Sequence, residues 1–348
     1  MVRVTVTPGP SRLSMTNRAD SETGGERAGV GRTPNVPLTE RDGVTLREEV
    51  RDWGALDGDR ATGWRDSVFS FRDYLRDKED VATVFENGET GEQASSSSPH
   101  RFAPEYADTQ YAKLKDLERG IGEAYGKRLY TSMLTFTASS TDDMGRPRPP
   151  VDHLDDLLES WDAIRRALDR VLEGRRWERL AILEPHKSGY AHIHMAVFVD
   201  GPVTTTTFEP VIEAHVRNCE PARGEAHDLD DDSTISVRHA GADRDADDDE
   251  VLDELAIYLA EYLGTYGEDP RDAPGHVQAF NAVLWASGRQ RWRPSNGAQE
   301  YMATDSGEAE SEWEMVGVEV DGEFMEADPE NGGVDRFTTG TDPPPGGP

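Results

Sequence analysis

Residues 129–199 alternate between strand-like and helix-like hydrophobic patterns. The run at 129–137 (LYTSMLTFT) is rich in β-branched and aromatic residues, which favour strands. Residues 151–172 place apolar side chains at three- and four-residue spacing, which predicts a long amphipathic helix. Two more strand-like runs, 177–183 and 192–199, flank the turn-forming sequence PHKSG, so we expect an antiparallel hairpin. This order favours an α+β fold over a doubly wound parallel sheet.

The surrounding sequence extends the same pattern. Further helices are predicted at 111–125, 208–218, 251–265 and 277–285, and a further strand at 234–239. Together these segments predict a central antiparallel sheet of about five strands with flanking helices.

The two ends of the chain differ from this middle part. Residues 1–45 are rich in Gly, Pro, Ser, Thr and Arg without apolar periodicity, and residues 304–348 are acidic and end in DPPPGGP. The hydrophobic fraction of 35% fits one packed domain with polar extensions. We therefore expect an accessory, largely disordered region at 1–100, one packed domain at 101–303 and an acidic disordered tail at 304–348.

The charge of the chain is strongly negative, with 69 acidic and 37 basic residues and a formal net charge of −32. In moderate salt such a charge argues against a nucleic-acid partner. However, only five basic residues are lysines, and an acidic surface with arginine in place of lysine suits a cytoplasm at molar salt. There the Debye length is about 3 Å, so DNA binding depends on short-range contacts. The charge indicates a salt-adapted habitat; an acidic disordered regulator from a moderate-salt organism is the alternative.

Two absences narrow the class of protein further. Cys219 is the single cysteine, which excludes an intramolecular disulfide framework and a multi-cysteine zinc site. No apolar run approaches the roughly 20 residues that span a membrane, and the N-terminus lacks the hydrophobic stretch of a signal peptide. We expect a soluble, cytoplasmic protein with no membrane partner.

A candidate metal site lies in the predicted hairpin. His192 and His194 are two residues apart in a strand, so both imidazoles project from one face and can meet one ion. Glu184, at the end of the preceding strand, offers a carboxylate as a third ligand. Such a set leaves coordination positions open for a phosphate and water, as in catalytic sites. The alternatives are an incidental His-x-His pair and a cupin-type metal site.

A candidate nucleophile lies in the predicted helix 251–265. Tyr258 and Tyr262 are one helical turn apart and therefore share a helix face. Tyrosines at this spacing commonly serve packing. A tyrosine can also attack a phosphodiester that a metal ion polarises and form a covalent intermediate.

A basic and aromatic cluster, GRQRWRP, follows the last predicted helix. Arginines can bind phosphates through both guanidinium nitrogens, and a tryptophan can stack on a base, which suits a single-stranded nucleic acid. The alternative is a surface turn with a buried tryptophan. The sequence contains no GxxxxGKS or GxxxxGKT phosphate-binding loop, so any DNA unwinding would come from another protein. The predicted contacts are Arg289, Arg291, Trp292 and Arg293.

Three segments in chain order resemble the three motifs of HUH replication initiators: LTFTAS at 134–139, the E-x7-HIH segment at 184–194, and YLAEYL from Tyr258. The resemblance covers about residues 111–303 and is greatest to initiators from plasmids and viruses of halophilic archaea. It implies a ferredoxin- or RRM-like HUH endonuclease fold for 101–303. It also implies a rolling-circle replication initiator, a metal-dependent endonuclease and strand transferase that nicks and joins single-stranded origin DNA.

The resemblance assigns roles to the residues of the first two motifs. Motif one is a core strand beside the site, and Thr135 and Thr137 fall within it. Motif two binds a divalent cation, Mg²⁺ or Mn²⁺, through His192, His194 and Glu184.

Motif three supplies the nucleophile. By position this is Tyr258, and Tyr262 partly matches the family variant that uses two tyrosines. Attack leaves a 5′-phosphotyrosine link and a free 3′-hydroxyl that primes synthesis. The implied partners are therefore single-stranded origin DNA and the helicase and polymerase of the host.

One position departs from the family. The motif-three tyrosine is commonly followed three residues later by a lysine, and here Glu261 occupies that position. Lys187 or a nearby arginine would have to supply the missing positive charge, so Lys187 is added to the predicted DNA contacts.

Other functions stay open at the level of sequence. A transposase or a plasmid-mobilising relaxase would use the same chemistry. A non-catalytic DNA- or RNA-binding regulator would need no metal ligands, and a cupin-like metalloenzyme would have no use for Tyr258.

Overall fold

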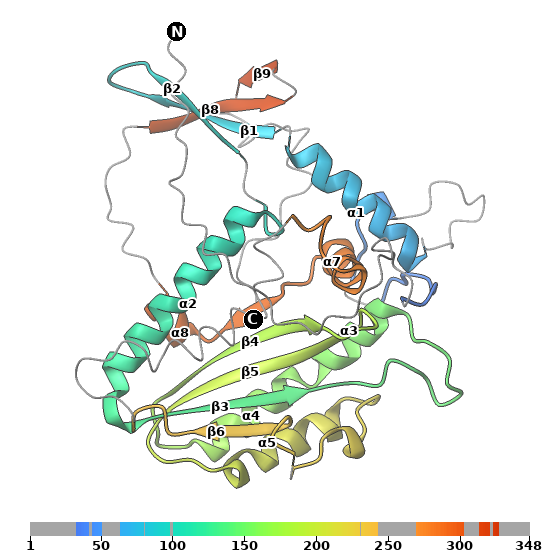
Figure 1. Cartoon of the computed structure of the whole chain (residues 1–348), viewed down its shortest axis with the longest axis vertical. Helices are drawn as coiled ribbons and strands as arrows, with labels where there is room; N and C mark the ends of the chain where they lie inside the picture. Colours follow the sequence, from blue (N-terminus) through green and yellow to red (C-terminus); the bar gives the residue numbers. More distant parts are fainter. Residues whose placement is uncertain are drawn as a thin grey trace, which may run out of the picture. The chain divides into compact units, whose positions relative to one another are not determined.

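The structure is a computed structural model that describes residues 33–41, 44–50, 63–79, 81–97, 100–229, 231–242, 269–302, 313–320 and 323–326 (Figure 1). Contacts within the chain divide it into two compact units. The smaller unit draws on Asp73–His100 and Ser306–Pro348, and the larger unit comprises Val30–Arg72 and Arg101–Asp305.

The larger unit is built on a five-stranded antiparallel sheet with the order β6-β3-β5-β4-β7. The predicted α+β fold with a central antiparallel sheet of five strands is therefore confirmed, as is the hairpin of β4 and β5. The strands are β3 (Leu129–Phe136), β4 (Trp177–Pro185), β5 (Ala191–Asp200), β6 (Ile235–Arg238) and β7 (Trp292–Pro294).

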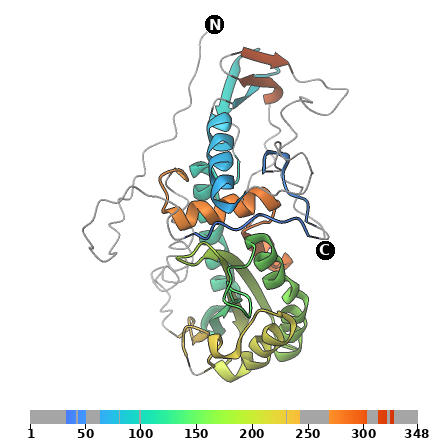
Figure 2. The same cartoon turned by 90° about the vertical axis from the view of Figure 1, so that its right-hand side faces the viewer.

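Helices cover both faces of this sheet. Alternate residues of β4 and β5 pack against α2 and α8 in a core that includes Leu180, Ile182, Ala196 and Phe198. The opposite face lies over α4 and α5 (Figure 1), and α7 packs near β4 and α3 (Figure 2). The helices are α2 (Pro104–Tyr125), α3 (Pro150–Glu159), α4 (Trp161–Val171), α5 (Thr205–Asn218), α7 (Gly275–Ser287) and α8 (Asn296–Tyr301), with 3-10 turns η1 (Glu48–Val50), η2 (Gly126–Arg128) and η3 (Gly224–Ala226).

One predicted helix is divided in the structure. The sequence predicted a continuous helix at 151–172, whereas α3 and α4 meet at Ser160. The hydroxyl of Ser160 donates to the carbonyl of Leu157 and lies 2.7 Å from Nδ1 of His215. A serine that bonds the backbone and a second element competes with the regular helix, which accounts for the break. The helix predicted at 251–265 lies outside the described residues.

The larger unit also contains residues that precede Arg101. The first part of α1 (Trp64–Glu79) lies in it, and the indole Nε1 of Trp64 donates to the carbonyl of Ala279 at 2.8 Å. The Arg47 guanidinium donates to the carbonyl of Trp285 at 2.8 Å. The polar composition of the residues before Arg101 gave no sign that they pack on the larger unit, because only a few side chains, such as Trp64, anchor them there.

The smaller unit is a four-stranded antiparallel sheet with the order β2-β1-β8-β9. It pairs strands from the predicted accessory region with strands from the predicted tail. The sequence WEMVGVEV at β8 contains four residues of high strand propensity, Trp313 and three valines, but it does not alternate apolar and polar residues and it lies in an acidic region, so it was not predicted as a strand. The strands are β1 (Val81–Asn87), β2 (Gln93–Ser97), β8 (Trp313–Val320) and β9 (Glu323–Glu326).

Among the helices that the structure describes, none is both long and apolar enough to cross a membrane.

Candidate metal centre

The hairpin of β4 and β5 brings the three predicted ligands together. Glu184 pairs with His192 across the ladder, and Ile182 pairs with His194. The three side chains project from the same face of the sheet, because residues of equal parity share a face. The intervening Ile193 is 1% exposed on the other face, so a shift of one residue in register would bury the ligands and expose the core.

The turn between β4 and β5 is fixed by its backbone. The amide of His186 donates to the carbonyl of Tyr190, and the amide of Gly189 donates to the carbonyl of His186, both at 2.8 Å. Gly189 has a φ of +89°, and a Cβ there would lie 3.0 Å from the indole of Trp64. Glycine is therefore required at this position, and the turn holds the ladder register that aligns the ligands.

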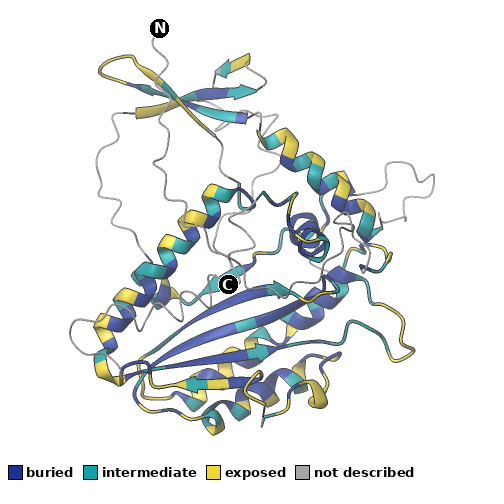
Figure 3. Cartoon of the chain, in the orientation of Figure 1, coloured by how far each residue is buried: buried dark blue, intermediate teal, exposed yellow. Residues whose placement is uncertain are grey.

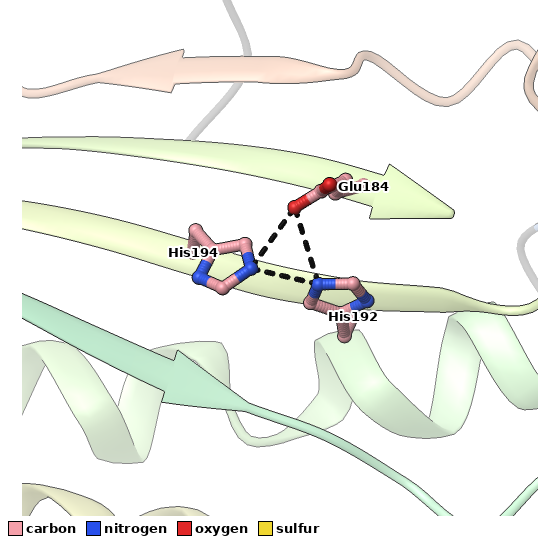
Figure 4. Close-up of side chains that lie close together, drawn as sticks. All are labelled: Glu184, His192 and His194. Carbon is pink, nitrogen blue, oxygen red and sulfur yellow. Dashed lines mark hydrogen bonds and ion pairs between the residues drawn. The ribbon is translucent and has the colours of Figure 1, made fainter. Parts of the chain in front are cut away.

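The ligand atoms converge on one point (Figure 4). Oε2 of Glu184 lies 2.9 Å from Nε2 of His194 and 3.2 Å from Nε2 of His192, and the two Nε2 atoms are 2.7 Å apart. Neighbouring donors around an ion with bonds of about 2.1 Å are about 3 Å apart in octahedral geometry. Among the described residues these three form the group suited to holding an ion, and their geometry and chemistry fit a divalent cation.

The electrostatics of the site match the protonation states that a metal ion needs. Burial by itself would raise the pKa of the Glu184 carboxyl, but the hydrogen bonds from His192 and His194 outweigh it and lower that pKa to about 2. Burial lowers the pKa of His192. At neutral pH the site therefore offers a carboxylate and a neutral imidazole, which can bind a cation without first losing a proton.

Thr135 of strand β3 and Thr137, just beyond the end of that strand, lie beside the candidate site. Oγ1 of Thr135 lies 3.2 Å from Nδ1 of His194, the contact that orients a ligating imidazole. Oγ1 of Thr137 lies 3.5 Å from Nε2 of His186. The two predicted motif-one threonines thus lie beside the candidate metal centre.

Sequence reasoning assigned no role to His186. Its ring centroid lies 4.2 Å from that of His192, and burial followed by the charge of His192 lowers its pKa to about 4. The imidazole of His186 is thus neutral at pH 7 and lies beside the ligand His192. Its position within the PHKSG turn, two residues after Glu184, was the available sequence signal.

Lys187 lies in the same turn and is exposed. Its charge, after the larger effect of burial, lowers the pKa of His276 on α7. Lys187 lies two residues beyond the end of β4, and its role in compensating for Glu261 stays a prediction. Glu261 itself, with Tyr258 and Tyr262, lies outside the described residues.

The arginines of the basic cluster have partners within the protein. The guanidinium of Arg289 pairs with the carboxylate of Asp155. Arg291 is 7% exposed, and its Nε donates to the carbonyl of Leu183 at 3.0 Å. Both side chains link β7 and the preceding turn to neighbouring elements.

The other two predicted DNA contacts also pack against the protein. Trp292 packs partly buried against the core beneath α2 and α8. The guanidinium of Arg293 lies 5.4 Å from the ring centroid of Trp161, on whose ring Arg179 also stacks at 4.7 Å. Any role of these residues in DNA binding stays a prediction.

Comparison with known proteins identifies a protein family that this chain matches. A family model described as "Putative rep protein (DUF1424)" matches residues 38–347. The match includes the candidate metal centre, the N-terminal segment packed on the larger unit, and the strands β8 and β9.

Two relatives come from the genus Halobacterium, and both are called "Uncharacterized 36 kDa protein". The relative from Halobacterium salinarum is 46% identical over 321 residues, which cover 89% of this chain and 100% of the relative. The relative from Halobacterium sp. (strain GN101) is 44% identical over 323 residues, which cover 88% of this chain and 97% of the relative. No solved structure matches the chain significantly.

Proposed function

Because the chain belongs to the family described as "Putative rep protein (DUF1424)", we propose that it is a rolling-circle replication initiator that nicks and rejoins single-stranded origin DNA. The observation that carries the proposal is the convergence of Glu184, His192 and His194 within about hydrogen-bonding distance of one another. A regulator that only binds DNA has no need of such a ligand set.

The chemistry follows from the chain's own residues. Glu184, His192 and His194 would hold Mg²⁺ or Mn²⁺, which when bound supplies a Lewis acid for the scissile phosphate. Because Glu184 is the single carboxylate of this ligand set, a divalent ion held there would keep a net positive charge toward the DNA. Lys187 adds a second positive charge at the exposed turn.

Tyr258 is the proposed nucleophile. Its phenolic oxygen forms a bond to phosphorus while the bond to the 3′ oxygen breaks, which leaves a 5′-phosphotyrosine and a 3′-hydroxyl. Rejoining reverses these steps with a second 3′-hydroxyl. The host helicase and polymerase would act on the nicked origin, and the reaction would take place in the cytoplasm.

Cleavage of a labelled single-stranded origin, read on a denaturing gel with Mn²⁺ or Mg²⁺, tests the proposal. His194→Ala should abolish cleavage, because it removes one of three converging donors. His239→Ala is the matched control, since His239 is exposed and stacks on Tyr130 away from the ligands. Cleavage by His194→Ala at the rate of the unaltered protein would contradict the proposed site.

The same experiment separates the alternatives. A DNA- or RNA-binding regulator would retard the origin strand without cutting it in any divalent cation. A transposase or relaxase would cut, but at transposon ends or a transfer origin in preference to the replication origin of the same element.

A further inference from the structure

The connection between β3 and α3 forms a structured hairpin at 139–148, which extends away from the end of the sheet (Figure 1). Thr141 and Pro147 form an antiparallel bridge, and the amide of Arg148 donates to the carbonyl of Ser140 at 3.0 Å. A further backbone hydrogen bond, from the amide of Asp142 to the carbonyl of Arg146, measures 2.9 Å. The 139–148 hairpin therefore has its own ladder.

The tip of this hairpin is fixed by Asp142. Its Oδ1 accepts hydrogen bonds from the amides of Met144 and Arg146, both at 2.9 Å. Gly145 takes a φ of +75°, which closes the turn. Met144 is 71% exposed, more than any other large apolar side chain in the described part of the chain. This apolar side chain is thus presented to solvent on a turn in which residues 143–147 are all exposed (Figure 3).

Both stems of the hairpin are attached beside the metal centre. The carbonyl of Ala138 lies 3.2 Å from Nε2 of His153, and Ala138 follows the threonine that contacts His186. On the return side, the hydroxyl of Tyr190 donates to the carbonyl of Arg148 at 2.6 Å. Tyr190 is two residues before His192, so the hairpin and the ligand strand share an anchor.

The acidic residues at the tip are neutralised. Asp142 pairs with Arg146 at 2.7 Å, and Asp143 pairs with Arg223 at 2.8 Å. The tip therefore presents no uncompensated negative charge to a phosphate backbone, unlike the strongly acidic chain as a whole.

We propose that the 139–148 hairpin is a second DNA contact, at which the side chain of Met144 wedges against a base of the strand bound at the metal centre. The inference rests on the proposed function. Apolar side chains, methionine included, unstack bases in this way. The tip is about four residues from the stem, or roughly 13 Å in extended chain, which spans about four stacked nucleotides.

The net charge of −32, which indicates adaptation to molar salt, favours DNA bases as the occupant over phosphates. Contacts to phosphates weaken steeply as salt rises, whereas burial of apolar surface does not weaken and strengthens in salting-out ions. An apolar contact at a neutral tip is therefore the kind of interaction that remains effective in molar salt.

Fluorescence of 2-aminopurine tests this contact directly. The base analogue is placed singly at positions one to eight nucleotides from the nick site, on either side, in a strand bound by full-length protein without divalent cation. We expect a change of fluorescence confined to one or two positions about four nucleotides from the nick, and its loss in Met144→Ala. A uniform signal that Met144→Ala leaves unchanged would overturn the proposal.

Binding affinity supplies the second measurement. Met144→Ala should weaken binding about fivefold or more, the lower end of measured base-stacking contributions, and the loss should be equal in 0.5 and 2 M KCl. Met315→Ala, which removes another exposed methionine from the smaller unit, is the control and should bind as the unaltered protein does. Equal affinity of both variants refutes the hairpin contact.

These results are distinguishable from failure of the proposed function. If the protein never cleaves, but Met144→Ala still weakens binding and removes the fluorescence change, the nuclease is refuted and the hairpin contact stands. If cleavage occurs and Met144→Ala binds normally, the hairpin contact is refuted alone. Near-ultraviolet circular dichroism checks the fold of the variant, which keeps all backbone bonds of the turn.

Discussion

Replacement of Glu184 by glutamine tests the metal centre most directly, because it keeps the size of the side chain and removes its charge. The pKa of Glu184 is about 2, against an ordinary value of 4.5. At 1.36 kcal/mol per pH unit, this difference corresponds to roughly 3 kcal/mol in favour of the carboxylate. Because the pKa is lowered in the folded protein, this stability is present above about pH 4.5 and is lost as the pH falls toward 2.

The expected result without metal follows from that magnitude. In EDTA at pH 7, Glu184→Gln should lower the free energy of unfolding by up to about 3 kcal/mol, less the contribution of the amide oxygen that still accepts a hydrogen bond. Glu213→Gln is the matched control, since Glu213 is exposed on α5 and its carboxylate pairs with Arg217 at 3.1 Å. The control should change stability by less than about 1 kcal/mol.

Addition of Mn²⁺ separates a metal ligand from a structural carboxylate. At a concentration about 100 times its dissociation constant, a ligand stabilises the native state by about 2.7 kcal/mol, which raises the melting temperature of a unit of this size by about 5–10 °C. A hundredfold weaker affinity in Glu184→Gln would leave about 0.4 kcal/mol at the same concentration. An equal Mn²⁺-induced rise in both proteins, measured by calorimetry, would refute the assignment of Glu184 as a ligand.

Three further predictions concern the nucleophile, salt and acid. Tyr258→Phe should eliminate the covalent protein–DNA adduct seen by mass spectrometry, whereas Tyr262→Phe should retain initial nicking. An adduct on Tyr262 alone would contradict the assignment of Tyr258 as the nucleophile. With a net charge of −32, the protein should lose circular dichroism signal in ~0.1 M KCl relative to ~2 M KCl, and equal spectra would speak against salt adaptation. Burial lowers the pKa values of His153 and His215 to about 4, so stability should fall from about pH 6.5 to 4 by up to roughly 3 kcal/mol for each histidine; a flat urea-denaturation profile over this range would contradict the buried, neutral state.

The candidate metal centre could be predicted from sequence because local patterns determine it. Strand periodicity places His192 and His194 on one face, and the short PHKSG turn leaves few registers for β4 against β5. Glu184 then falls opposite His192 without any knowledge of distant parts of the chain. Four of the five strands of the larger sheet followed from the same local signals. The fifth strand, β7 (Trp292–Pro294), did not, because its sequence was interpreted as a basic cluster or a surface turn.

Features that depend on contacts between distant residues could not be predicted. The strands β1 and β8 are separated by more than two hundred residues, so neither segment by itself shows the pairing that forms the smaller sheet. Likewise, the break at Ser160 depends on His215, which a helical pattern does not reveal. The contribution of residues before Arg101 rests on individual anchors such as Trp64.

The arginines of the basic cluster show that side chains predicted to contact DNA can also have partners within the protein. Arg289 and Arg291 have partners inside the fold, so their charges are already compensated or buried. In molar salt a diffuse positive surface would add little affinity in any case, because phosphate contacts lose their electrostatic advantage. The proposed recognition of DNA would then depend on contacts shorter than the Debye length of about 3 Å. The proposed coordination of a divalent ion by Glu184, His192 and His194 meets that condition, and so does the proposed apolar contact of Met144 with a base.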